Sequence, residues 1–510
     1  MSAHTHSAAL PTPARLRALI DAIGQGLLER EAAVRLALLA ALAGEHVLLI
    51  GPPGTAKSAL ARRLHHAFVD TRYFERLLTR FSTPEELFGP LSLKALEHDR
   101  YERLTEGFLP TAGIAFLDEV FKANSAILNA LLTLLNEREF DNGTQRQKVP
   151  LISVVAASNE VPADEALQAF HDRFLVRVPV APVGDAAFAA LLALAATASA
   201  PTSAPRSAAT SASNAEHAAS GPTTHPGPTP NGEVAPALSE RERKAVADAA
   251  VRISLGADFM DGCHALRAWL AQHQLVMSDR RWRQFVGLAQ TAAATEQRPA
   301  LDVLDLWLAP YVASAQPRDL PLLQRWFVDE ALHAPPEAAP WLERAVQAFE
   351  KQLGNEQQTP AEGSSGPDDG AGKLALARAI GLHAQDDAEP GLQRIVSGRL
   401  EERLRKRWGQ CHIAARVAQV AQIEADLAGW TAELEAQRDA LSQRLSTRLW
   451  MPPDLKAQVL ERHERALAQL AGWAERLAAA REGFALLPVD DAPDLSEDAA
   501  PPPMAWGSTD

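Results

Sequence analysis

The sequence predicts an α/β fold with a doubly wound parallel sheet in its first part, followed by purely helical regions. Three short apolar runs, at 46–50, 113–117 and 152–157, are separated by helical patterns. Short buried strands that alternate with helices are typical of a parallel sheet covered on both faces. Aromatic residues make up only 6% of the 510 residues, while Ala and Leu abound. This composition favours helices over sandwiches and barrels.

Changes in composition divide the chain into domains. Segment 197–240 contains no Phe, Tyr or Trp, and Val234 and Leu238 are its only large aliphatic residues. It cannot bury enough apolar surface to offset its ordering entropy, so we expect it to be disordered. The predicted divisions are an α/β core at 12–196, this Ala/Ser/Thr/Pro-rich insertion at 197–240, an all-α lid at 241–312, a helical arm at 313–353 and 373–487 interrupted by a polar linker at 354–372, and an acidic disordered tail at 488–510.

The C-terminal half predicts a helical bundle. Apolar residues recur mostly at three- and four-residue steps from 413 to 445 and from 460 to 484, with Pro452-Pro453 between the two segments. Proline interrupts helices, so this pattern predicts an antiparallel helical hairpin. Trp341–Leu353 shows the same spacing and can complete a three-helix bundle.

Charge and cysteine content disfavour several classes of protein. The net charge is −14 and the pI about 5.6, which argues against a large nucleic-acid footprint because such a footprint needs a basic face. Cys263 and Cys411 lie far apart without a CxxC spacing, so we expect neither a disulfide framework nor a zinc site. We see no signal peptide, and the apolar runs at 36–50 and 186–200 are shorter than the roughly 18 residues of a spanning helix. We therefore expect a cytoplasmic protein without a membrane span.

The residues after the first apolar run predict a phosphate-binding loop. Val47–Ile50 is predicted to form a strand, and Gly51–Ser58 leads from it into a helix. Small loop residues let backbone N–H groups approach phosphate oxygens, and the helix N-terminus adds the positive end of its dipole. Lys57 is expected to reach the β- and γ-phosphates of ATP, and the Ser58 hydroxyl to bind Mg²⁺. The residues predicted to surround the nucleotide are Gly51, Pro52, Pro53, Gly54, Thr55, Ala56, Lys57, Ser58 and Ala59.

Ala56 stands where glycine usually precedes this lysine. If the position needs a positive φ, alanine costs roughly 1 kcal/mol there, which a folded domain tolerates. An ordinary strand–turn–helix without a ligand is the alternative interpretation of the whole segment.

Two further strands end in polar residues suited to nucleotide hydrolysis. Ile114–Leu117 leads into Asp118 and Glu119; Asp118 is predicted to hold Mg²⁺, and Glu119 to act as general base toward the attacking water. The run from Ile152 ends at Asn159, whose amide is predicted to orient that water. The alternatives are a solvated strand end for the acidic pair and a turn former for Asn159. The order of the three motifs along the chain favours the functional interpretation.

These motifs give the chain a resemblance to the MoxR branch of the AAA+ ATPases, and within it to the RavA group of regulatory ATPases. Three stretches add to the resemblance: Arg80–Ser92 (RFSTPEELFGPLS), Ala126–Leu132 (AILNALL) and Ser278–Trp282 (SDRRW), together with Asp172-Arg173-Phe174. The similarity covers residues 15 to 310 well and is looser over the C-terminal helices.

The resemblance implies further site residues. Arg173 resembles the arginine finger that a neighbouring subunit inserts toward the transferred phosphoryl group; an arginine that merely pairs with Asp172 is the alternative. Arg280 resembles the nucleotide-contacting sensor 2 arginine of the lid, with the adjacent Arg281 as the other candidate. Segment 137–149 resembles the hairpin before the sensor 1 strand, and 81–110 resembles the insertion that faces the ring pore.

The resemblance also implies cofactors and partners. We expect ATP with Mg²⁺, a homohexameric ring, and chaperone-like remodelling of client proteins together with a VWA-domain protein of the ViaA type. RavA carries a small β-rich domain that binds inducible lysine decarboxylase. The corresponding region here, about 354–398, is short and polar, so we do not expect decarboxylase binding in that form.

Three other functions compete with this one. A MoxR-type ATPase that matures a metalloenzyme, or a chelatase-like motor subunit, lacks the long helical C-terminal half. A nucleic-acid motor is disfavoured by the acidic balance, and the basic residues of 403–407 follow Glu401 and Glu402 on what is predicted to be a solvated helix face. A scaffold that binds nucleotide without hydrolysing it is disfavoured by the intact set of predicted catalytic residues.

Overall fold

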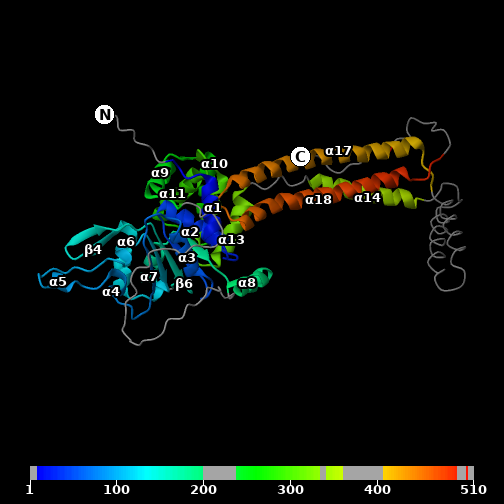
Figure 1. The fold of residues 1–510 in the computed structure, drawn as a ribbon. Helices are drawn as coiled ribbons and strands as arrows, with labels where there is room; N and C mark the ends of the chain where they lie inside the picture. The colour runs from blue at the N-terminus through cyan, green and yellow to red at the C-terminus, as the bar shows by residue number, and fades with distance from the viewer. Residues whose placement is uncertain are drawn as a thin grey trace, which may run out of the picture. The chain divides into compact units, whose positions relative to one another are not determined.

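A computed structural model describes residues 9–162, 164–198, 237–332, 340–359, 406–490 and 501–502 (Figure 1). The chain forms two compact units. The first comprises Met1–His333 and Leu445–Ala457, and the second comprises Ala334–Arg444 and Gln458–Asp510. Most of the predicted insertion, linker and tail lies outside the described residues, as does the part of the predicted arm at 373–405.

The first unit is built on a five-stranded sheet whose strand order is β2-β3-β6-β1-β7. All neighbouring strands pair in parallel, which confirms the predicted doubly wound parallel core. The apolar runs form its three central strands. Of the two edge strands, β2 contains Glu75 and Arg76, and β7 is only four residues long and includes Arg177, so neither stands out as an apolar run in the sequence. The strands are β1 (Val47–Ile50), β2 (Tyr73–Leu77), β3 (Ile114–Asp118), β6 (Ser153–Ser158) and β7 (Val176–Pro179).

Helices cover this sheet. Two insertions extend from it, the segment 81–110 and a β-hairpin. The predicted hairpin is present as β4 (Glu139–Asn142) and β5 (Gln145–Lys148). Its turn needs Gly143, because φ is +66° and a Cβ atom there would lie 2.0 Å from the carbonyl oxygen of Tyr101. Figure 1 shows this hairpin beside α5.

The helices of the core are α1 (Pro13–Gly24), α2 (Glu31–Ala43), α3 (Lys57–His65), α4 (Pro84–Phe88), α5 (Leu93–Leu96), α6 (Ser125–Glu137), α7 (Glu165–His171) and α8 (Asp185–Ala198), with short turns η1 (Leu109–Thr111) and η2 (Val120–Lys122).

A helical lid follows in the same unit. Ser278 caps α11 by accepting a hydrogen bond from the backbone N–H of Arg281, and Ser239 forms a capping box with Glu242, so both helix starts are encoded locally. The lid elements are α9 (Glu240–Ala250), β8 (Ser254–Leu255), α10 (Ala257–Gln272), α11 (Asp279–Thr295), β9 (Ala300–Leu301), η3 (Val303–Leu308), α12 (Ala309–Ala313), α13 (Asp319–Trp326) and η4 (Phe327–Ala331).

The lid extends further along the chain than the sequence indicated. We assigned residues from 313 onward to the arm, whereas the structure groups those up to His333 with the first unit. The reason is packing: Trp326 and Phe327 are buried, and the Trp326 ring lies 6.3 Å from that of Trp269 in α10. A contact between segments so distant in the chain is not visible in local periodicity.

The second unit contains the predicted helical bundle, made of α14 (Pro340–Gln358), α17 (Gln410–Thr447) and α18 (Pro453–Ala485). Figure 1 shows the three helices running alongside one another. Their shared core includes Leu342, Val346, Phe349, Val420, Ile423, Leu427, Leu470, Trp473, Leu477 and Phe484.

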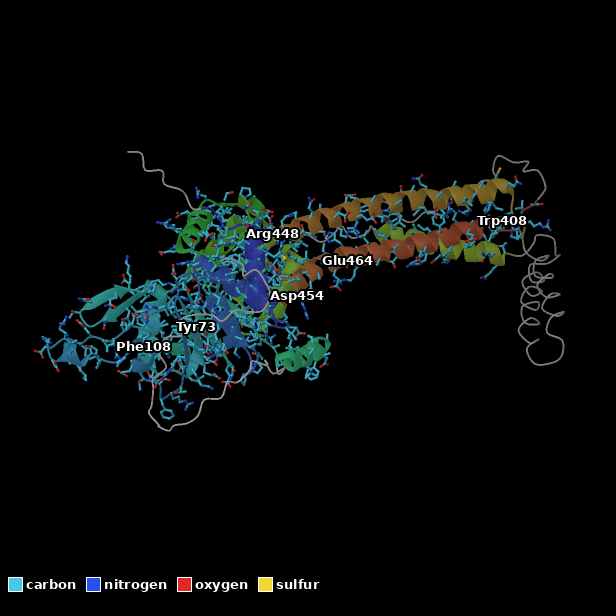
Figure 2. The ribbon with its side chains drawn as sticks, viewed as in Figure 1. Tyr73, Phe108, Trp408, Arg448, Asp454 and Glu464 are labelled. Carbon is cyan, nitrogen blue, oxygen red and sulfur yellow. The ribbon has the colours of Figure 1, made fainter. Side chains whose placement is uncertain are left out.

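Helix α14 runs to Gln358, five residues into the segment predicted as a linker. Glu356 explains the extension, because it is buried and accepts hydrogen bonds from Arg416 (3.0 Å) and His412 (3.1 Å) of α17. These charged contacts outweigh the roughly 1 kcal/mol that Gly354 costs inside a helix. Trp408, labelled in Figure 2, stacks on the His412 ring at 4.3 Å.

The two most apolar runs of the sequence have different surroundings. Leu36–Leu42 is buried within α2, whereas Phe188, Leu191 and Leu192 of α8 are exposed. No helix within the described ranges is both long and apolar enough to cross a membrane.

Glu45 lies where the core contacts the lid. It lies between α2 and β1, and its Oε2 accepts a hydrogen bond of 2.7 Å from Gln284 Nε2 on α11. Burial raises the pKa of this carboxyl group to about 7, although the positive charges of Arg138 and Arg280 oppose the shift. The folded protein therefore favours the protonated carboxyl group more than the unfolded chain does.

We expect Glu45 to make stability fall as pH rises. Its pKa is above the unfolded value of 4.5, so its contribution is fully present below pH 4.5 and is lost by about pH 7. The loss amounts to at most roughly 3 kcal/mol. Glu45→Gln should remove this part of the pH dependence when urea unfolding is followed between pH 4.5 and 7.5. Glu475→Gln, at an exposed position of α18, is the control, and equal pH profiles for the two variants would contradict the assignment.

Candidate nucleotide-binding site

The loop between β1 and α3 has the backbone shape of a phosphate cradle. A Cβ atom on Gly51 would lie 2.0 Å from the carbonyl oxygen of Val180, so only glycine fits there. Gly54 and Ala56 both have positive φ, at 80° and 63°. Ala56 therefore adopts the conformation for which glycine usually occupies this position, at a cost to alanine of roughly 1 kcal/mol. Helix α3 begins directly afterwards at Lys57, so its first N–H groups face the loop.

The Lys57 ammonium group lies within this loop. Its Nζ donates to the carbonyl oxygens of Gly51 and Pro52, both at 2.8 Å. Burial lowers the pKa of Lys57, while the negative charges of Asp118 and Glu119 act against that shift. The loop and the acidic strand end, about sixty residues apart in the chain, therefore act on each other electrostatically.

Strand pairing explains why these groups meet. Strand β6 pairs in parallel with β1 on one side and with β3 on the other. The carboxyl ends of parallel strands lie at one edge of a sheet, so the polar groups that follow all three strands gather there. The predicted residues that lie at this edge are Lys57, Ser58, Asp118, Glu119 and Asn159.

Glu119 is held between an amide and an amine. Asn159 Nδ2 donates to Glu119 Oε1 at 2.6 Å, and Lys122 Nζ lies 3.3 Å from Glu119 Oε2. The backbone of Glu119 is left-handed, with φ 52°, and its N–H donates to Asp118 Oδ1 at 3.0 Å. Two fixed contacts and an unusual backbone conformation orient the carboxylate, as a base requires.

The donor groups fit a magnesium nucleotide. Mg²⁺ prefers oxygen ligands and is bound by one or two protein groups together with phosphate and water. Ser58 supplies a hydroxyl group and Asp118 a carboxylate at the edge that the Lys57 amine occupies. The loop itself offers backbone N–H groups and a cation to phosphate oxygens. The hydroxyl, carboxylate, amine and backbone N–H groups at this edge are therefore those that a magnesium nucleotide needs.

Among the described residues Arg173 forms no ion pair with Asp172, the pairing that was the alternative interpretation, although the charge of Asp172 acts on it. The Asp172 carboxylate instead lies 3.4 Å from Arg281 Nη1 and 3.9 Å from Arg177 Nη2. Within the described residues, the buried Nε of Arg173 has no hydrogen-bond partner. Burial, and then the nearby charge of Arg280, lower the pKa of Arg173. The negative charge of Asp172 opposes this shift, so Arg173 has one unsatisfied nitrogen and a carboxylate nearby.

Arg280 and Arg281 have different surroundings. Arg281 is only 3% exposed and ties the lid to the core by donating to backbone carbonyls. Its acceptors are the carbonyl oxygens of Asp172, Phe174, Leu175 and Val312. Such a committed side chain is not available to a nucleotide, which leaves Arg280 as the candidate for that contact.

Arg280 lies at the sheet edge where the strands begin. Its charge acts on Glu45 and His46, which directly precede β1, and on Arg173, which precedes β7. The phosphate cradle follows the opposite end of β1, and the charges that act on Lys57 do not include Arg280. Within one chain, the structure therefore does not bring Arg173 and Arg280 to the other predicted site residues.

Two residues of the site were missed from sequence. Lys122 contacts Glu119, as described above. Arg30 is buried and donates from Nε to the Thr55 carbonyl oxygen (3.1 Å) and from Nη2 to that of Ala181 (2.6 Å), which supports the cradle from behind. Neither residue belongs to a motif, and a lone basic residue beside a predicted helix gave no signal.

Comparisons with known proteins agree with this geometry. Residues 14–216 match the family described as the MoxR domain in MoxR-vWA-beta-propeller ternary systems, and residues 258–327 match the AAA lid domain. Neither description names the RavA group.

Individual proteins are also similar to parts of the chain. An uncharacterised protein of Methanocaldococcus jannaschii is 52% identical over 164 residues, 32% of this chain and 43% of that protein. Protein MoxR of Paracoccus denitrificans is 28% identical over 174 residues, 33% of this chain and 50% of its own length. A solved structure from Cytophaga hutchinsonii has a TM-score of 0.42 at 14% identity, over 61% of this chain and 85% of that one. The chain thus covers half or less of the length of each of these two sequence relatives. Residues 14–216 are thus similar to a MoxR domain and residues 258–327 to an AAA lid domain, and both matches fall on the parallel-sheet core and the helical lid described above.

Proposed function

We propose that the protein is a Mg-ATP-hydrolysing motor that remodels partner proteins. The observation that supports this best is the contact of Asn159 with Glu119 at 2.6 Å, at the edge where Asp118 and Glu119 also act on Lys57. A nucleotide-binding scaffold needs the cradle and the lysine, but it does not need an oriented carboxylate beside them.

Each residue has a defined part in the proposed hydrolysis. Lys57 and the loop N–H groups hold the phosphates, and Ser58 and Asp118 hold Mg²⁺, which neutralises charge on the triphosphate. Glu119 accepts a proton from the attacking water, and Asn159 orients that water and the carboxylate. The Ala56 and Glu119 backbones, both left-handed, fix these groups before ATP arrives.

The remaining two predicted residues support a ring. Arg173 and Arg280 lie at the sheet edge opposite the cradle, so in this proposal they reach the nucleotide of a neighbouring copy. An arginine supplied in this way stabilises charge on the transferred phosphoryl group. The full site then consists of two subunits, and a homohexamer is the closed arrangement that we propose.

A VWA-domain protein is the partner that we propose. The matched family is described by its association with vWA and beta-propeller proteins, and the RavA resemblance implies a ViaA-like VWA protein. Most of the region in which RavA carries its decarboxylase-binding domain lies outside the described residues here. Metalloenzyme maturation is the alternative within the family, and purification with the VWA protein would separate the two by the client that accompanies it.

The loop before α4 presents an aromatic residue that fits a polypeptide client. Phe81 is 89% exposed and begins the segment 81–110, which resembles a pore-facing insertion. An exposed aromatic ring gains most by burying its surface against another chain. We therefore propose Phe81 as a contact to the client.

Glu119→Gln should abolish turnover while ATP binding survives. The amide keeps the shape of the side chain but cannot accept the proton, and loss of a general base costs about a hundredfold or more. Phosphate release and equilibrium binding of ATP measure the two properties. Glu97→Gln, on the exposed turn after α5, is the control. Equal turnover by wild type and Glu119→Gln would remove Glu119 from this role.

Arg173→Ala and Arg280→Ala should each lower ATP turnover by about tenfold or more, because both act on a neighbour's nucleotide. Mixing either variant with Glu119→Gln subunits, whose arginines are intact, should partly restore phosphate release. Arg283→Ala, at an exposed position of α11 three residues after Arg280, is the control. Absence of rescue in mixed rings would leave the two arginines with a role inside their own chain.

Phe81→Ala should weaken client binding without changing basal turnover. Fluorescently labelled casein serves as an unfolded polypeptide, and its anisotropy is followed with the ATP-bound Glu119→Gln protein. We expect the affinity to fall by about threefold to tenfold, as for a truncated aromatic contact. Val276→Ala, an equally exposed lid residue, should have no effect. If the two variants bind casein equally, Phe81 is not a client contact.

A further inference from the structure

The loop that joins α17 to α18 is built into the first unit. Leu445–Ala457 belongs to that unit, although most of both helices belongs to the second. Leu449, Trp450 and Met451 are buried, and Arg448 is only 2% exposed. We call this loop the tip loop. A loop that only connected two helices of a hairpin would not need so many buried side chains.

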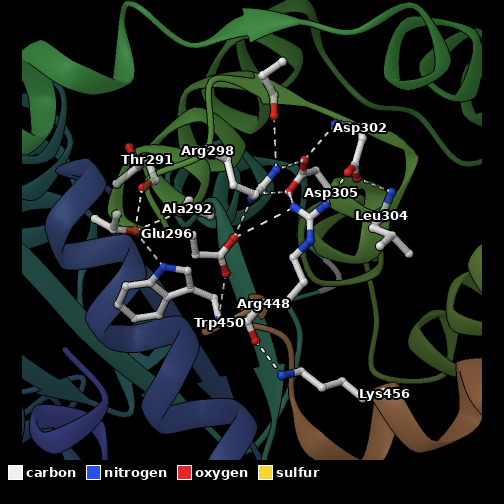
Figure 3. Close-up of polar contacts among 12 residues, drawn as sticks. Thr291, Ala292, Glu296, Arg298, Asp302, Leu304, Asp305, Arg448, Trp450 and Lys456 are labelled. Atoms are coloured by element: carbon white, nitrogen blue, oxygen red, sulfur yellow. Dashed lines mark hydrogen bonds and ion pairs between the residues drawn. The ribbon is translucent and has the colours of Figure 1, made fainter. Parts of the chain in front are cut away.

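A buried cluster of charges holds the tip loop to the lid (Figure 3). Arg448 Nη1 donates to Asp305 Oδ1 at 2.9 Å and lies 3.8 Å from Glu296 Oε2. Its Nη2 donates to Asp302. Arg298 of the lid contacts the same Asp305 and Glu296. Three carboxylates thus surround two guanidinium groups, and removal of Arg448 would leave buried negative charge uncompensated.

The neighbouring Trp450 holds the C-terminal end of α11. Its Nε1 donates to Thr295 Oγ1 at 2.8 Å, and its backbone N–H donates to Glu296 Oε1 at 3.3 Å. Thr295 is the last residue of α11, and Glu296 caps it. From the other side, Arg35 of α2 donates to the Leu449 carbonyl oxygen. The tip loop therefore links the end of α11 to a helix of the core.

The opposite end of α11 carries the arginines of the proposed ATP site. Arg280 and Arg281 occupy its first turn, and Arg281 binds the backbone around Arg173. A helix of 17 residues is about 25 Å long and is stiff along its axis. A displacement of one end of α11 is therefore transmitted to the other end.

We propose that Arg448 and Trp450 are positioning residues for ATP hydrolysis. By fixing the C-terminal end of α11, the tip loop sets where Arg280 and the Arg173 segment stand. Because α17 and α18 both continue from the tip loop, a load on the helical bundle changes the arginine positions. Equally, nucleotide-driven movement of the lid reaches the bundle. This inference rests on the proposed role of Arg173 and Arg280.

Trp450→Phe in the full chain tests the proposal, because it removes the indole donor and keeps most of the buried ring. We expect kcat for ATP to fall by about threefold to tenfold, the size of one lost hydrogen bond expressed in the transition state. The KM for ATP should stay within about twofold, since the phosphate cradle is untouched. Thr295→Val removes the acceptor and should have the same effect, and the double variant should lose no more than either single variant.

The matched control is Trp473→Phe, which truncates a buried tryptophan in the core of the second unit. It should leave kcat unchanged. Hydrogen exchange of residues 279–285 supplies a readout that does not need turnover, and it should rise in Trp450→Phe and not in Trp473→Phe. Equal kcat and equal exchange in the two variants would overturn the proposal. Absence of turnover in the wild type would instead contradict the proposed function, while the exchange measurement would still test the link along α11.

Discussion

The parallel pairing of β6 with both β1 and β3 is the constraint on which the site depends. The register sets Leu49 against Ala157 and Phe116 against Val155. It therefore brings the phosphate cradle, the acidic pair and Asn159 to one edge. A shift of two residues in either pairing would move one group by about 7 Å relative to the others. Because all three strands are buried on both faces, the core opposes such a shift strongly.

The same sheet separates two sets of charges. One edge holds Lys57 with the acidic pair, and the other holds Arg173 and Arg280. Burial, and then the charge of Arg280, lower the pKa of Arg173, while Asp172 opposes the shift. The buried Nε of Arg173 has no hydrogen-bond partner among the described residues, and an unsatisfied buried donor is costly in an isolated chain. An anionic ligand from a neighbouring copy would relieve that cost, so the electrostatics of a single chain favour the ring that we propose. Helix α11 then joins this edge to the tip loop.

The sequence was informative where a local pattern has one physical meaning. Glycines and small residues before Lys57, a carboxylate pair after an apolar strand and Pro452-Pro453 each predicted the structure that is observed. A positive φ at Ala56 was considered as a condition only, because glycine usually occupies this position, and the structure shows it. Contacts between distant segments were not predictable. Lys122 beside Glu119, Arg30 behind the cradle and Arg448 in the lid are ordinary basic residues until the fold brings their partners close.

The central claim is that the edge formed by β1, β3 and β6 binds a magnesium triphosphate through Lys57. Equilibrium binding of a fluorescent ATP analogue to wild type and to Lys57→Ala, with Mg²⁺ present, tests it most directly. Loss of the ammonium contacts should weaken affinity by about a hundredfold or more, the worth of two charge-assisted hydrogen bonds. Equal affinity of the two proteins would contradict the account.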